Sequence, residues 1–167
     1  MAFLEIKNLS KGFASPEGGI LPVVEIDDFS MAEGNQRALR GVSGSGKTTF
    51  LHLIAGILQP DEGSISFDGK VVTKAKGNLM FGLSEGERDR LRADAIGYVF
   101  QSFNLLQGHT CLENLLLPMA FSDNVNRERA EELLHDFALT ERAAELTETY
   151  SHGMKQRLAL AAALIHR

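Results

Sequence analysis

The feature that most constrains the fold of this chain is the stretch at residues 41–49, which reads GVSGSGKTT. It fits the pattern G-x-x-x-x-G-K-[ST], in which glycines let the backbone approach a ligand closely. Successive backbone N–H groups then form a concave anion site at a helix N-terminus. In this pattern Lys47 reaches the β- and γ-phosphates of a nucleotide, and the Thr48 hydroxyl completes the Mg²⁺ shell. The alternative is an ordinary glycine-rich turn before a helix.

The residues around this loop favour the phosphate site over the simple turn. Residues 49–58 predict a helix that ends at Pro60 and Gly63 and has one apolar face, formed by Phe50, Leu53, Ile54, Ile57 and Leu58. Residues 36–40 are expected to be the strand that enters the loop, although they are less apolar than such a strand usually is. We therefore expect ATP and Mg²⁺ as ligands, held by Gly41, Ser43, Gly44, Ser45, Gly46, Lys47, Thr48 and Thr49.

Length and composition limit the other classes of function. The 167 residues, 44% of them hydrophobic, suffice for one globular domain. The net charge of −5 argues against non-specific nucleic-acid binding, which requires a basic surface. The single cysteine, Cys111, cannot form an internal disulfide, which indicates a reducing cytoplasm, and the five histidines show no metal-ligand spacing. The start of the chain has no signal-peptide pattern and the longest apolar run, 158–165, is too short to span a bilayer, so a membrane role would require a partner.

Periodicity and turn signals predict the remaining elements. Strands are expected at 3–9 and 23–29, with a loop at 14–21 between them, and a hairpin over 64–72 turns at Asp68-Gly69. The continuous apolar run 96–100 predicts a strand buried on both faces. A helix is expected from Ser84 to about residue 95, and the chain from about 103 is expected to be helical, with helix starts at Thr110, Asn126, Thr140 and Ser151.

This order of elements and motifs resembles the nucleotide-binding subunit of an ABC transporter over residues 3–167. The resemblance implies an α/β P-loop NTPase core with an antiparallel β subdomain and an α-helical insert. It implies one domain over residues 1–167, with the β subdomain and P-loop core at 1–100, a Q-loop and helical insert at 101–150, and a signature helix at 151–167. The run from Gln101 to Pro118 is most similar to the lipoprotein-release and macrolide-export branch.

The resemblance assigns roles to two residues outside the P-loop. Phe13 matches the aromatic residue on which this family stacks adenine; the alternative is a plain core or turn phenylalanine. Gln101 matches the Q-loop glutamine, which in the family senses Mg²⁺ and the γ-phosphate and couples the site to the transmembrane partner. The alternative for Gln101 is a polar residue that closes a strand. Thr48 and Gln101 are the expected Mg²⁺ ligands.

The stretch 150–157, YSHGMKQR, stands where the family has its L-S-G-G-Q signature. Ser151 and Gly153 fit that pattern, as do Gln156 and Arg157, whereas Tyr150, His152 and Met154 depart from it. In the family this helix N-terminus faces the γ-phosphate bound by a second subunit, by the same anion–helix interaction as at the P-loop. A capped core helix is the alternative.

The family's hydrolytic residues come after the signature helix: an apolar strand ending in Asp-Glu and, later, a switch histidine. The sequence ends at Arg167, before any of them. The stretch 23–28 resembles that strand superficially but lies upstream of the P-loop, and His52, His109 and His166 are misplaced for the switch. We therefore expect a C-terminally truncated fragment with an incomplete core sheet and no catalytic residue, which binds ATP without efficient hydrolysis.

The resemblance implies an ATPase subunit that powers an ABC transporter. The similarity of the run from Gln101 to Pro118 favours export over import. Its partners would be a transmembrane permease and a second copy in a head-to-tail dimer, and not nucleic acid. Its place would be the cytoplasmic face of the plasma membrane. One alternative is a nucleotide-binding module without turnover. Another is a soluble ABC-type ATPase acting on DNA or ribosomes, which the compact acidic chain does not favour.

Overall fold

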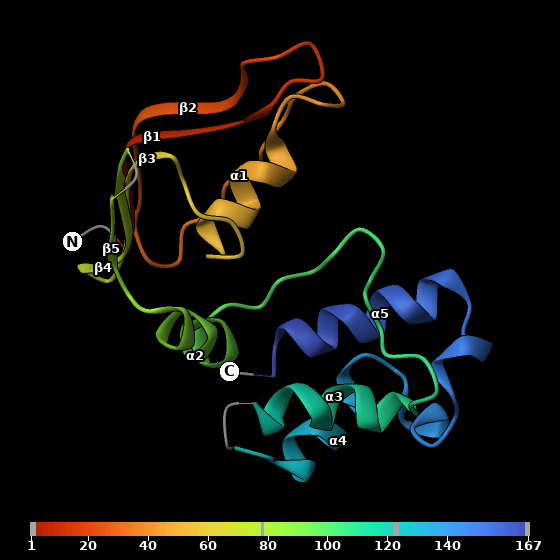
Figure 1. Ribbon diagram of the computed structural model, residues 1–167. Helices are drawn as coiled ribbons and strands as arrows, with labels where there is room; N and C mark the ends of the chain where they lie inside the picture. The colour runs from red at the N-terminus through yellow and green to blue at the C-terminus, as the bar shows by residue number, and fades with distance from the viewer. Residues whose placement is uncertain (1–2, 78, 122–123, 166–167) are drawn as a thin grey trace. The chain divides into compact units, whose positions relative to one another are not determined.

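The computed structural model describes residues 3–77, 79–121 and 124–165. The chain divides into two compact units, Met1–Arg88 and Asp89–Arg167, and each is described by itself. The first contains the β-sheet and the P-loop helix, and the second contains most of the helices (Figure 1). Among the described residues, no helix is both long and apolar enough to cross a membrane.

The first unit is built on a five-stranded antiparallel sheet with the strand order β2-β1-β3-β4-β5. The strands are β1 (Leu4–Ala14), β2 (Ile20–Met31), β3 (Glu62–Phe67), β4 (Lys70–Lys76) and β5 (Leu79–Gly82). The first two strands are longer than predicted, since their ladder continues to the pair Ala14 and Ile20 and leaves only a short connection. The hairpin at Asp68-Gly69 is confirmed, with φ of 46° and 73° at the two turn residues, as a tight hairpin turn requires.

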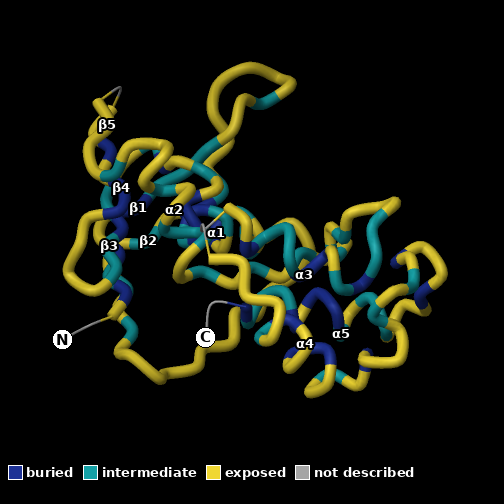
Figure 2. The backbone as a smooth tube through the Cα atoms, turned by 90° about the horizontal axis from the view of Figure 1, so that it is seen from below, coloured by how far each residue is buried: buried dark blue, intermediate teal, exposed yellow. Residues whose placement is uncertain are grey.

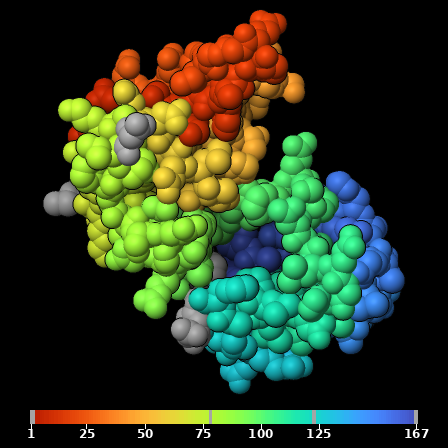
Figure 3. Space-filling view, in the orientation of Figure 1, coloured from red at the N-terminus to blue at the C-terminus, as the bar shows by residue number. Residues whose placement is uncertain are grey.

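Alternation along the strands places apolar side chains on one face of this sheet. Ile6 and Ile65 are opposite each other and fully buried. Helix α1 (Lys47–Ile54) contributes Phe50 and Leu53 to the same core. The helix packs against β2, and the two elements adjoin in the space-filling view (Figure 3). Burial of one sheet face against α1 therefore holds the P-loop at the sheet.

Two expectations around the P-loop are wrong. Residues 36–40 are exposed and form no strand, because their polar side chains supply no apolar face and no neighbouring strand pairs with them in the described residues. The helix after the loop ends at Ile54 rather than near residue 58, since Gly56 takes a φ of 66° just beyond the C-cap Ala55. Glycine at this position ends a helix before Pro60 is reached.

Helix α2 (Glu85–Ala95) begins as predicted, at a capping box. The Ser84 backbone N–H donates to the Glu87 carboxylate at 2.8 Å, and the Glu87 N–H donates back to the Ser84 hydroxyl at 3.3 Å. The strand predicted at 96–100 is wrong: these residues are half-buried or exposed and belong to no sheet. A buried parallel strand needs neighbours on both sides, and the described residues provide none for this run.

The second unit is a cluster of helices around one apolar core. Its elements are α3 (Cys111–Ala120), α4 (Arg127–Asp136) and α5 (His152–Ala163), with short 3₁₀ turns η1 (Thr140–Arg142) and η2 (Thr147–Thr149). The predicted caps are confirmed, because the side chains of Thr110, Asn126 and Ser151 accept from the backbone N–H three residues on. Residues 103–109 are not helical, contrary to expectation, since Phe103 and Asn104 both have positive φ.

The core of the second unit lies between α3, α4 and α5, whose buried segments are visible in Figure 2. Its fully buried members come from all three helices: Cys111, Leu115, Ala130, Leu158 and Ala161. This shared core holds the three helices together.

Candidate functional site

The P-loop leaves the sheet without regular structure and enters α1 through two glycines in the left-handed region. Gly44 has a φ of 79° and Gly46, the N-cap of α1, a φ of 81°. The Phe50 N–H donates to the Gly46 carbonyl at 2.8 Å, which forms the first turn of the helix. Glycine adopts these angles without the steric cost of a Cβ atom. The free N–H groups of the first turn are thereby available to an anion.

Gly46 also fixes the loop to the sheet. A Cβ atom at Gly46 would lie 2.4 Å from the Val23 carbonyl oxygen, so the loop backbone and β2 are in direct contact. Val23 stands where the register of β1 and β2 shifts, between the pairs Lys11–Val24 and Gly12–Pro22. It is the extra residue of a β-bulge, a feature that bends a strand locally. The P-loop is therefore seated on this bulge.

The Lys47 ammonium lies against acceptors of the loop itself. Its Nζ donates to the carbonyls of Gly41 at 2.9 Å and Val42 at 2.6 Å, and to the Ser45 hydroxyl at 3.2 Å. A Cβ atom at Gly41 would lie 2.7 Å from the Ser45 Oγ, so this turn also requires a small residue. Phosphate oxygens compete with these loop acceptors for the N–H donors of Lys47. A hydrogen bond from the ammonium to a charged phosphate is stronger than one to a neutral carbonyl or hydroxyl, so a bound phosphate would displace them.

The remaining P-loop residues match the chemistry of a bound metal–nucleotide. Ser43 and Thr48 are exposed, and Thr49 is half-buried at the start of α1. A hydroxyl at the position of Thr48 is a hard oxygen ligand of the kind that Mg²⁺ prefers. Two left-handed glycines, an ammonium and an exposed hydroxyl at one helix N-terminus therefore fit MgATP.

Phe13 lies on β1 beyond the same bulge and is 43% exposed. The Lys11 Nζ lies 5.7 Å above the centroid of its ring. The ring is thus not part of the core cluster, which weakens the alternative of a plain core phenylalanine. An aromatic ring with an accessible face is a stacking surface for a nucleobase.

Gln101 belongs to the second unit and is exposed in a turn after Phe100. The Phe103 N–H donates to the Phe100 carbonyl at 3.0 Å, and the Ser102 hydroxyl donates to the Asn104 amide oxygen at 2.7 Å. Phe103 and Asn104 take φ of 63° and 49°. Such angles are uncommon for non-glycine residues and are found at functional sites.

The N-terminus of α5 carries the other predicted residues of the second unit. The Ser151 Oγ accepts from the Met154 N–H at 3.3 Å, and a Cβ atom at Gly153 would meet nothing within 4 Å. The His152 ring lies 5.0 Å from the Phe103 ring in an edge-on arrangement. The structure therefore brings the segment after Gln101 together with the start of α5. The P-loop and Phe13 both belong to the first unit.

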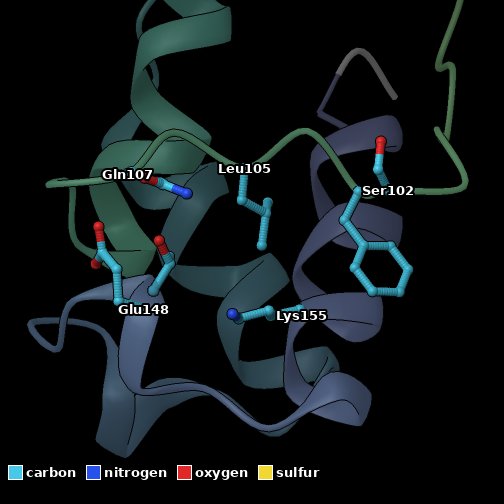
Figure 4. Close-up of a pocket in the computed structure, with 7 residues that line it drawn as sticks. Ser102, Leu105, Gln107, Glu148 and Lys155 are labelled. Atoms are coloured by element: carbon cyan, nitrogen blue, oxygen red, sulfur yellow. The ribbon is translucent and has the colours of Figure 1, made fainter.

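A cavity of about 120 Å³ lies beside this contact. Figure 4 shows that the segment 102–107 forms one side and that Glu148 and Lys155 lie opposite it. The hydrogen bond from the Gly108 N–H to Glu148 lowers the pKa of that carboxyl, and the charge of Lys155 adds to the effect. Sequence reasoning missed this cavity, because its lining comes from separate segments: Ser102, Phe103, Leu105, Gln107, Thr147, Glu148 and Lys155.

The loop at 106–110 is held by Asn114, which is only 4% exposed. The Asn114 Oδ1 accepts from the Leu106 N–H at 2.7 Å, and its Nδ2 donates to the carbonyls of Leu106 at 3.2 Å and Thr110 at 3.0 Å. On the opposite side, the Thr147 hydroxyl donates to the Leu106 carbonyl at 3.2 Å. The loop is thus fastened both to α3 and to the residues before α5.

Asn114→Ala is expected to lower the free energy of unfolding of the second unit by about 3 kcal/mol, because it removes the hydrogen bonds that the buried Asn114 amide makes to the loop backbone. The measurement is urea unfolding followed by far-ultraviolet circular dichroism. The matched control Asn124→Ala, at an exposed position, should change the free energy of unfolding by about 0.5 kcal/mol or less. Equal effects of the two substitutions would contradict the role given to Asn114.

Comparison with known proteins shows which family this chain resembles. A family model described as "ABC transporter" matches residues 24–167. The lipoprotein-releasing system ATP-binding protein LolD of Syntrophus aciditrophicus is 36% identical over 165 residues, which cover 97% of this chain and 70% of that protein. The macrolide export ATP-binding/permease protein MacB of Marinobacter nauticus is 34% identical over 166 residues, covering 98% of this chain and 24% of that protein.

The fold is also that of a solved ATP-binding cassette. The dimeric post-hydrolysis structure of the cassette MJ0796, bound to ADP and Pi, superposes with a TM-score of 0.83 at 32% identity. The match covers 98% of this chain and 69% of the cassette. The expected α/β cassette fold and the resemblance to the lipoprotein-release and macrolide-export branch are both confirmed. Since the family model spans most of the sequence, this chain belongs to the ABC transporter family of ATP-binding proteins.

Proposed function

We propose that this chain is the ATP-binding subunit of an export-type transporter and couples MgATP binding and hydrolysis to transport by a membrane partner. The observation that carries the proposal is the P-loop, where two left-handed glycines and Lys47 lie at the N-terminus of α1. The relatives named for lipoprotein release and macrolide export support the direction of transport. A permease would hold the subunit at the cytoplasmic face of the plasma membrane.

Nucleotide binding in this proposal uses groups of the first unit. The N–H groups of residues 43–49 and the Lys47 ammonium bind the β- and γ-phosphates. The Phe13 ring stacks on the adenine, and the Thr48 hydroxyl would hold Mg²⁺. When bound, Mg²⁺ would supply positive charge that neutralises the phosphates. None of these residues polarises the attacking water, so their contribution is to bind and orient the nucleotide.

A second copy would complete each nucleotide site. The dimeric cassette with which this chain shares its fold supports a head-to-tail pair. In such a pair the N-terminus of α5, with Ser151 and Gly153, faces the γ-phosphate bound by the partner subunit. Both residues are exposed and the space around Gly153 is open, as an intermolecular anion contact requires.

Gly153→Asp is expected to abolish MgATP-dependent dimerisation while leaving ATP binding to the monomer unchanged. A carboxylate there favours the helix by about 0.5 kcal/mol but repels the γ-phosphate of the partner. At about 4 Å and an effective dielectric of about 20, this repulsion is about 4 kcal/mol, or about a thousandfold in the dimerisation constant. Analytical ultracentrifugation with and without MgATP measures the effect.

The matched control is Gly86→Asp. Gly86 is the second residue of α2 after its N-cap, as Gly153 is in α5, and its surroundings are equally open. Gly86→Asp should dimerise like the parent chain. If both variants dimerise normally, or if neither the parent nor the control responds to MgATP, the head-to-tail pair is wrong.

A nucleotide-binding module without turnover is the second candidate, favoured by one observation. His152 stands in the stretch where the family has glycine, and its imidazole ring packs on the Phe103 ring. The two candidates differ in the rate of phosphate release. If the chain is an ATPase, it releases phosphate faster than its Lys47→Ala variant. If it is a binding module, it binds ATP but releases phosphate at the same background rate as that variant.

A further inference from the structure

Asp61 makes three hydrogen bonds to one short segment of β1. Its Oδ1 accepts from the Lys11 ammonium at 2.7 Å, and its Oδ2 accepts from the Gly12 N–H at 2.8 Å. Its own N–H donates to the Ser10 carbonyl at 2.9 Å. Asp61 lies in the connection between α1 and β3, so it ties the chain that follows the P-loop helix to the strand that carries Phe13.

The residues that Asp61 holds are those of the bulge. The register of β1 and β2 shifts between Lys11 and Gly12, directly before Phe13. A Cβ atom at Gly12 would lie 2.4 Å from the Ile20 Cγ2 atom, so the backbone approaches β2 closely there. A bulge re-aims the side chains that follow it. The direction of the Phe13 ring therefore depends on the geometry that Asp61 fixes.

Lys11 connects the carboxylate to the ring. Its ammonium is bonded to Asp61 and lies 5.7 Å above the Phe13 centroid, within the range of a cation–π interaction. The ammonium thus takes up one face of the ring and leaves the other to a base. Burial alone would raise the pKa of Asp61, but the hydrogen bonds from Lys11 and Gly12 outweigh it and lower the pKa, so the carboxylate is charged at neutral pH.

We propose that Asp61 is a positioning residue of the nucleotide site, which holds Lys11 and the bulge so that Phe13 presents one face to the adenine. This inference rests on the proposed function, since it requires that Phe13 stacks on the base. The same bulge seats the P-loop, because the extra residue Val23 contacts Gly46. Asp61 bonds to the β1 side of the bulge, next to Phe13, whereas the P-loop contacts Val23 on the β2 side, so we expect loss of the carboxylate to affect binding of the base and not of the phosphates.

The test separates base from phosphate recognition by comparing ATP with inorganic tripolyphosphate, which lacks the base and sugar. Both ligands are measured by competition against a fluorescent nucleotide on the full chain. Phe13→Leu should weaken ATP about fivefold or more and leave tripolyphosphate unchanged, because base stacking is lost. Asp61→Asn, which keeps the shape and removes the charge, should weaken ATP about two- to fivefold, also with tripolyphosphate unchanged.

The double variant Asp61→Asn/Phe13→Leu should bind ATP no more weakly than Phe13→Leu alone, because Asp61 acts through the ring. Asp27→Asn is the matched control: the same change at an exposed position of β2 should affect neither ligand. Thermal unfolding of each variant shows that it is folded.

Four outcomes overturn the inference. Additive losses in the double variant, or an equal loss for ATP and tripolyphosphate in Asp61→Asn, would show that Asp61 acts on the fold or the phosphates. If Asp61→Asn has an unchanged ATP affinity and Phe13→Leu a weaker one, the Phe13 ring stacks on the base without help from the Asp61 carboxylate. If Phe13→Leu does not change the ATP affinity while tripolyphosphate binds, Phe13 does not stack on the base, and the P-loop remains the phosphate site. If neither ligand binds the parent chain, the proposed function fails first.

Discussion

Lys47→Ala is expected to weaken ATP binding by about a hundredfold or more, the largest effect on ATP affinity among the substitutions considered. The Lys47 Nζ donates to exposed acceptors of the loop, the Gly41 and Val42 carbonyls and the Ser45 hydroxyl. Water replaces those bonds at little cost, so the variant should fold normally. The phosphates, in contrast, lose two or more charge-assisted hydrogen bonds worth about 1.5–3 kcal/mol each.

Equilibrium dialysis with labelled ATP measures this affinity directly. Lys74→Ala, which removes the same charge from an exposed position on β4, should bind ATP like the parent chain. If labelled ATP binds the Lys47→Ala variant as tightly as the parent, the P-loop is not the nucleotide site. A loss in both variants would indicate a general electrostatic effect instead of a specific contact.

Gly46→Ala is expected to be nearly as damaging to ATP binding, for a steric reason. The new Cβ atom would lie 2.4 Å from the Val23 carbonyl oxygen, which is backbone and cannot rotate away. The start of α1 must then move off β2, and the phosphate-binding N–H groups move with it. We expect an ATP affinity at least about thirtyfold weaker, together with a melting temperature lowered by several degrees.

Gly44→Ala is the matched control for this substitution. Gly44 has almost the same positive φ, but nothing lies within 4 Å of its Cβ position. This variant carries only the backbone strain of about 1–2 kcal/mol, so its ATP affinity should fall by no more than about thirtyfold. If the two alanine variants have the same affinity and melting temperature, the contact with Val23 does not determine the position of the loop.

Features that depend on neighbouring residues could be predicted from the sequence. The hairpin at Asp68-Gly69 and the caps at Thr110, Asn126 and Ser151 are confirmed, because a turn or cap needs only the residues within one turn. The P-loop itself is recognised by residue types at fixed spacing. The amino-acid sequence alone therefore suffices to indicate the family.

Features that depend on distant partners could not be predicted. Residues 96–100 have the composition of a buried strand, yet a strand exists only where another strand pairs with it. Asp61 gives no signal in the sequence, since its partners Lys11 and Gly12 are about fifty positions away. Phe103 has a positive φ that its side chain does not favour, which local propensity cannot anticipate.

The fastening of the 106–110 loop has a mechanical consequence for the second unit. Leu106 is bonded both to Asn114 in α3 and to Thr147. Thr147 opens η2, which ends two residues before the Ser151 cap of α5. The Phe103–His152 contact joins the same two segments at a second point. The segment that follows Gln101 and the residues at the start of α5 are therefore joined at two points, so we expect a displacement of one of them to displace the other.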